Sequence, residues 1–184
     1  MAENRVNFGI TNVYYAKATY SGGSVSYGST KRLSGAVSLS LSANSSDNTF
    51  YADNISYWKS SASQGYDGTL EMARLSEDFC KDILGVTVDT NGVILETTSD
   101  TTSPFALIFQ VEGDEDEEMR LLYYCTVTRP PLNANTMTDS TTPDTVTLDL
   151  TVSPRPDTGE IKASTGSTTA TSVASAWTTA VYTG

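Results

Sequence analysis

The chain has 184 residues, enough for one domain of ordinary size, and only 38% of them are apolar. Its formal net charge of −11 argues against binding to a nucleic-acid backbone or to an anionic membrane. Histidine is absent, so the commonest general base and metal ligand is missing. Met1 to Arg5 lead into no apolar segment, and no run reaches transmembrane length. We therefore expect a soluble protein made in a cytoplasm.

Alternation of apolar and polar residues predicts strands in the first part of the chain. Val13–Thr19 and Val25–Tyr27 flank Ser21-Gly22-Gly23, which fits a hairpin turn. The run Leu33–Leu41 predicts a half-buried strand, because serine and alanine alternate with an apolar set on one face: Leu33, Val37, Leu39 and Leu41. Another strand-like run is Thr69–Leu75.

Residues 42–68 separate two of these strands and are predicted to form a long inter-strand loop. The segment is polar at both ends, yet it carries Phe50, Tyr51, Tyr57, Trp58 and Tyr66. Such residues are enriched at protein interfaces. Two interpretations remain open: the loop caps its own core, or it is an arm that reaches a partner. We favour the arm, and we expect inter-subunit contacts at Phe50, Tyr51, Asp53, Asn54, Tyr57, Trp58 and Trp177.

One short helix is predicted next, with Ser76 as its cap, an apolar stripe from Phe79 to Leu84 and a stop at Gly85. Asn91-Gly92 is a strong hairpin signal between Val86–Val88 and Val93–Leu95. Cys80 lies on the helix stripe, and Cys125 is expected on the same strand face as Leu121, Tyr123 and Val127. Both cysteines are interpreted as small buried hydrophobes, although the sequence leaves a disulfide between them open.

Three further alternating strands are predicted at 105–111, 121–127 and 146–152. Between the first two, residues 112–118 hold six carboxylates in seven residues. Calcium-loop spacing is absent, so we interpret this run as a solvated hairpin tip. Pro130-Pro131 and Pro154-Arg155-Pro156 end strands. After Ala163 the chain is rich in Ser, Thr and Ala, and its composition alone predicts disorder.

The sequence contains no catalytic constellation. Serines and threonines are plentiful, but no residue pattern supplies an activating base, and neither GxSxG nor a phosphate-binding glycine loop occurs. We therefore expect no enzymatic activity, no cofactor and no metal, and a structural or binding role.

The order of several segments resembles the major tail proteins of long, non-contractile-tailed bacteriophages of Gram-positive hosts. The resemblance runs from about residue 6 to residue 162 and rests on Val6-Asn7-Phe8-Gly9, Asn12–Ala16, Leu33–Leu41, Phe50–Asn54, Gly65–Gly68, Phe79–Gly85 and Thr126–Pro130. Two features depart from the family: the acidic density at 112–118, and the tail after Ala163 in place of an additional C-terminal domain that some relatives carry.

The resemblance implies a tail tube protein of the virion. Its fold would be a β-sandwich with a long inter-strand loop at 42–68, and the protomers would form hexameric rings stacked into a hollow tube. The domain would span residues 1–162, with an N-terminal arm at 1–12, and residues 163–184 would form a C-terminal arm. Other tail proteins would be its partners, and the genome would pass through the lumen without specific binding. An acidic wall suits such a conduit, because like charges repel DNA.

A second class of protein also fits the composition. A soluble β-sandwich binding module for carbohydrate or surface adhesion would be rich in Ser and Thr and acidic as well. The missing signal peptide counts against this alternative, and so does a long aromatic arm where a concave aromatic platform would be expected.

Overall fold

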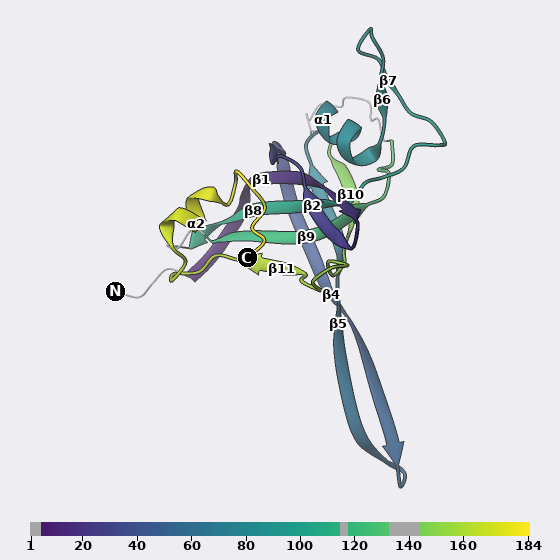
Figure 1. Cartoon of the computed structure of the whole chain (residues 1–184), viewed down its shortest axis with the longest axis vertical. Coiled ribbons are helices and arrows are strands. Elements are labelled where there is room, and N and C mark those ends of the chain that lie inside the picture. The colour runs from purple at the N-terminus through teal and green to yellow at the C-terminus, as the bar shows by residue number, and fades with distance from the viewer. Residues whose placement is uncertain (1–4, 115–117, 133–143) are drawn as a thin grey trace, which may run out of the picture.

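The computed structural model describes residues 5–114, 118–132 and 144–184, and it is mainly β, as the sequence predicts (Figure 1). Two short helical segments accompany the strands. In chain order the elements are β1 Arg5–Ser21, β2 Ser24–Tyr27, β3 Lys31–Arg32, β4 Ala36–Ala52, β5 Ile55–Met72, α1 Glu77–Phe79 continued by the π-helical turn η1 Cys80–Leu84, β6 Thr87–Val88, β7 Ile94–Leu95, β8 Phe105–Asp114, β9 Met119–Val127, β10 Val146–Val152, β11 Lys162–Ser164 and α2 Thr171–Ala176.

The main sheet is antiparallel and has the strand order β2-β1-β8-β9-β10-β5-β4. In Figure 1 the strands β4 and β5 cross β1, β8 and β9 steeply, so the sheet folds over itself like a sandwich. The first core cluster contains buried residues of several strands, including Phe105 and Leu107 of β8 and Leu148 and Leu150 of β10. Phe79 of α1 packs into this cluster edge-on against the rings of Tyr15 and Phe105.

The local predictions for the helix and the two short hairpins are confirmed. Ser76 caps the helix by accepting a hydrogen bond from the Phe79 amide, and Gly85 ends it at φ +76°. The turn after Ser21 joins β1 to β2. In the β6–β7 hairpin the Asp89 carboxylate accepts hydrogen bonds from the amides of Asn91 and Val93. Both cysteines carry free thiols, and Cys125 is fully buried.

Two predicted strand faces are wrong because β-bulges change the alternation. Phe105 pairs with Cys125, whereas Leu107 pairs with Leu122, so β9 has one extra residue in between. Cys125 and Val127 therefore face the first core cluster, while Leu121 and Tyr123 face the opposite side of the sheet. A similar irregularity between Ala36 and Ser38 leaves Val37 half exposed.

Composition alone predicts disorder for the C-terminal tail after Ala163, and this prediction is also wrong. Residues 162–164 pair with β9 as β11, and Trp177 packs on the far face of β8 and β9 against a second cluster. This segment covers the face that bears Ala106 and Ile108, which is why β8 is buried on both sides. The predicted extended arm at 163–184 is thus a cover on the protomer's own sheet.

The predicted arm at the other end also belongs to the sheet as far as the described residues go. Residues 5–12 are part of β1 and pair with β8, from Arg5 opposite Asp114 to Thr11 opposite Gln110. Residues 1–4 lie outside the described part. The acidic run predicted as a hairpin tip does lie between β8 and β9, but its residues 115–117 are outside the described ranges.

The predicted loop at 42–68 is a β-hairpin. Strands β4 and β5 pair from Ala36 opposite Met72 to Ala52 opposite Ile55, so almost the whole segment is regular strand. The hydrophobic pattern could not indicate this, because none of the described side chains from residue 42 to residue 64 is buried.

Candidate interaction surface

The β4–β5 hairpin projects far from the body of the protein (Figure 1). Its two-residue turn is Asp53-Asn54, and both residues have positive φ angles, +52° and +61°. This is the turn geometry that matches the twist of a two-residue β-hairpin, and Asn and Asp tolerate it better than most residues. Asp53 and Asn54, which the sequence predicts as inter-subunit contacts, therefore form the turn of the hairpin.

The outer part of the hairpin, residues 49–59, is here named the hairpin tip. Its large apolar side chains are between 54% and 72% exposed: Phe50, Tyr51, Ile55, Tyr57 and Trp58. Phe50 is paired with Trp58 across the ribbon, so these two rings share one face. Between Phe50 and Tyr51 the pairing register shifts by one residue, because β5 has an extra residue there. The tip thus presents a cluster of exposed rings, and it includes Ile55, which the sequence did not indicate as a contact.

A two-stranded ribbon without an apolar face against a core is only marginally stable in water. The hairpin is fixed at its base, where the Glu71 carboxylate accepts hydrogen bonds from Ser38 and Thr145. Gly65 and Gly68 permit the close approach of strands there, because a Cβ would clash with the carbonyl oxygen of Val152 or of Ser40, respectively. Beyond this base the side chains of the ribbon belong to neither core cluster of the described residues.

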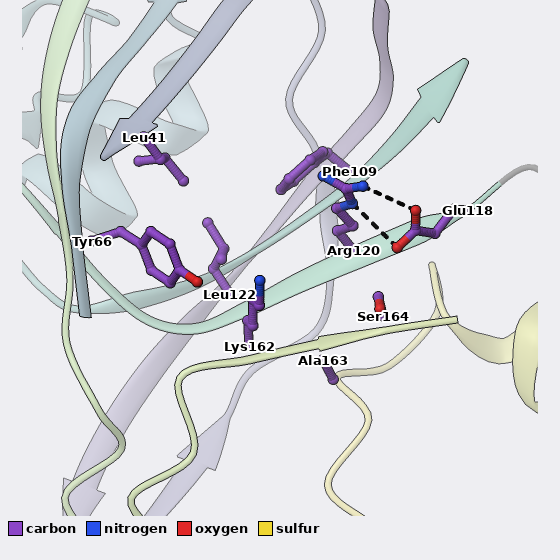
Figure 2. Close-up of a pocket in the computed structure, with 9 residues that line it drawn as sticks. All are labelled: Leu41, Tyr66, Phe109, Glu118, Arg120, Leu122, Lys162, Ala163 and Ser164. Atoms are coloured by element: carbon purple, nitrogen blue, oxygen red, sulfur yellow. Dashed lines mark hydrogen bonds and ion pairs between the residues drawn. The ribbon is translucent and has the colours of Figure 1, made fainter. Parts of the chain in front are cut away.

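A hollow lies at the base of the hairpin, between β4 and β5 on one side and β8, β9 and β11 on the other (Figure 2). It consists of two adjoining parts of about 280 and 480 Å³ that share Leu41, Phe109 and Arg120. We name it the basal groove, and its walls include Leu39, Leu41, Tyr66, Phe109, Arg120 and Leu122. The β11 side of the groove is formed by Lys162 and Ser164.

The charged groups of the basal groove are held in place by neighbours. Arg120 binds both carboxylate oxygens of Glu118, at 3.0 and 3.3 Å. The hydrogen bond from Arg120 is the main cause that lowers the pKa of Glu118, so this acid stays ionised. The Lys162 ammonium lies 5.4 Å from the centre of the Tyr66 ring. The groove therefore combines apolar walls with two cations and one anion.

Two polar clusters fix the body around these surfaces. Asp82 accepts hydrogen bonds from Lys31 at 2.7 Å and from Tyr15 at 3.1 Å, which joins η1 to β1 and β3. Burial opposes the ionisation of Asp82, but the two hydrogen bonds outweigh it and lower its pKa.

The second cluster surrounds Arg155, which is 6% exposed. Its guanidinium binds Asp157 through two hydrogen bonds and Glu160 through one, all between 2.9 and 3.0 Å. It also lies between the rings of Tyr27 and Tyr123, 5.7 and 5.3 Å from their centres. Hydrogen bonds from Arg155 and from the Val25 amide lower the pKa of Asp157 to about 2. The cluster ties the segment before β11 to β2 and β9.

Trp177, predicted as a contact outside the protomer's own core, is instead 4% exposed. Its ring packs in the second core cluster and stacks on Tyr182 at 5.3 Å. A single tryptophan in a Ser/Thr-rich tail gave no local signal for this placement, because its binding site is the far face of β8 and β9.

Among the described residues, no group of three or more His, Cys, Asp and Glu side chains is arranged to hold a metal ion. The described helices are also too short or too polar to cross a bilayer. No known protein-family model matches the chain, and a search of curated proteins finds no match.

Proposed function

We propose that this chain is the protomer of a bacteriophage tail tube, a structural virion protein that assembles into stacked rings around a lumen for the genome. The observation that carries the proposal is the projecting β4–β5 hairpin. Its tip exposes five large apolar side chains that contribute nothing to the protomer's own core. Single exposed apolar residues are ordinary, but a cluster of aromatics on a projecting ribbon marks an interaction site.

The remainder of the chain supports the same role. Its body is closed on the far face of β8 and β9 by its own C-terminal segment, whereas the β4–β5 hairpin is free to reach another molecule. The net charge of −11 suits a wall along which DNA slides without adhering. By the resemblance to tail tube proteins the rings are hexameric, the protein is made in the host cytoplasm and ends in the virion tail, and it acts without catalysis.

The test is the assembly state of the purified protein across a wide concentration range. Sedimentation velocity and negative-stain electron microscopy should reveal rings or tubes above a critical concentration, with or without other tail proteins. A protein that stays monomeric under all these conditions contradicts the proposal and favours the binding-module alternative.

A further inference from the structure

The first core cluster is open where β4 and β5 leave the body. Phe109 and Leu122 at the floor of the basal groove are buried, but Leu39, Leu41 and Tyr66 on its walls are only half-buried. The larger part of the groove, about 480 Å³, falls in the size range of sites that take small ligands, and the smaller part, about 280 Å³, lies just below that range. The described residues of the protomer thus leave part of its core surface without a cover.

The hairpin tip of the same chain cannot supply that cover. Leu41 borders the groove, and Phe50 lies nine residues further along the same extended strand, about 30 Å away at the usual rise of about 3.3 Å per residue. The ribbon runs away from the body over this distance (Figure 1). The hairpin tip can therefore reach only the basal groove of a different copy of the chain.

The chemistry of tip and groove is complementary. The tip offers exposed rings, and the groove offers apolar walls that rings can pack against. The ribbon carries Asp53 at its turn, with Asp47 and Lys59 nearby, so acids outnumber cations there, while the groove has Arg120 and Lys162 against one acid, Glu118. Attraction between these charges favours one orientation of the docked hairpin.

From these observations we infer that the basal groove binds the hairpin tip of a second copy of this chain. The inference rests on the proposed function and names the receiving surface. The contact is heterologous: each copy uses its tip on one neighbour and its groove on another. One free tip and one free groove remain at the ends of any row of copies, so the contact repeats and the assembly grows along the hairpin direction.

A photo-crosslink from the tip tests the placement directly. p-Benzoylphenylalanine replaces Trp58, the protein is assembled and irradiated, and mass spectrometry locates the crosslinked peptides. The expected adducts lie in β4 near Leu41, in β9 near Arg120 or in β11 near Ser164. Adducts confined to another surface overturn the inference. The exposed β6–β7 hairpin with Val93, Ile94 and Leu95 is the leading alternative of that kind.

A variant that fills the basal groove tests whether the groove contributes to the free energy of assembly. Ser164 is exposed in β11 and lines the groove, so Ser164→Trp should occupy it and raise the critical concentration at least tenfold. Thr147→Trp, on the exposed face of β10 outside the groove, is the matched control and should assemble normally. Melting curves establish that both variants fold. If Ser164→Trp does not fold, the pair Arg120→Gln and Lys162→Gln takes its place, with the same expected loss of assembly.

A mixture of two variants distinguishes an error in the assigned groove from an error in the proposed function. A variant without the tip rings, Phe50→Ala with Trp58→Ala, keeps an intact groove, and Ser164→Trp keeps an intact tip. Neither should assemble alone, but the mixture should form a complex that contains both chains. Normal tubes from Ser164→Trp, or no complex in the mixture, refute the groove while the proposed function stands. A wild-type protein that never self-associates refutes both.

Discussion

Truncation of the hairpin tip separates assembly from folding. In the double variant Phe50→Ala and Trp58→Ala, both changes remove rings from the same face of the ribbon. These side chains are 59% and 54% exposed and belong to neither core cluster. Each substitution should therefore cost the isolated protomer no more than about 0.5 kcal/mol, the usual range for surface positions. For a chain of this length a total of about 1 kcal/mol lowers the Tm by about 2–4 °C.

The same change should have a much larger effect on assembly. An aromatic anchor that enters a pocket on a partner typically contributes about 2 kcal/mol or more. Loss of even one such anchor raises the critical concentration about 30-fold, since 1.4 kcal/mol corresponds to a factor of ten. Pelleting of serial dilutions gives this concentration, and electron microscopy identifies what is pelleted.

Two results would refute this reasoning. A fall in Tm of more than about 10 °C would mean that the tip stabilises its own protomer, as the self-capping interpretation holds. An unchanged critical concentration with normal tubes would mean that the rings do not contact a partner. Tyr20→Ala is the control, because Tyr20 is a similarly exposed aromatic near the end of β1 and should alter neither quantity.

Three further predictions concern the body and the charge of the protein. Arg155→Ala removes one partner of a buried ionic cluster and should destabilise the fold by about 3 kcal/mol, since the acids left behind lose their cation. A circular dichroism melt should show the Tm about 6–12 °C lower, whereas Arg74→Ala, an exposed control, should melt like the wild type. The Tm should change little between pH 5 and 8, because histidine is absent, and should fall in acid. The folded-state pKa values of Asp82 and Asp157 lie below their unfolded values, so the stabilisation they give is complete above about pH 4 and disappears as the pH falls toward 2. Asp157→Asn should make the acid transition shallower; an acid transition as steep as the wild type's would contradict this assignment. Finally, mobility-shift assays at physiological salt should detect no affinity for double-stranded DNA, and micromolar binding would contradict the conduit proposal.

Much of the fold follows from local patterns in the sequence. Alternation along 146–152 predicts a strand with Leu148, Leu150 and Val152 inward, and the structure has this arrangement. Ser76 and Gly85 mark the ends of a helix because capping and left-handed geometry depend on neighbouring residues only. The aromatic residues of the tip could likewise be identified from the sequence as lying outside the core, because the residues around them do not alternate between apolar and polar as a half-buried strand does.

The basal groove could not be predicted from the sequence. Its walls come from β4, β5, β8, β9 and β11, which lie far apart in the chain, and no local pattern brings Leu41 next to Phe109 and Lys162. The same limit applies to the bulge in β9, which follows from pairing with β8 and turns Cys125 away from the face of Tyr123.

What the sequence by itself determined is where many of the strands of the body, two of the hairpin turns and the helix after Ser76 lie, because backbone preferences and side-chain alternation act over a few residues. It also determined that no histidine chemistry operates in this chain. Only the tertiary structure decided that 42–68 is a projecting ribbon, that Trp177 covers the protomer's own sheet, and that a groove opens at the hairpin base. These features depend on which distant segments pair and pack, and the free energy of that packing is shared among residues that carry no local sign of their partners.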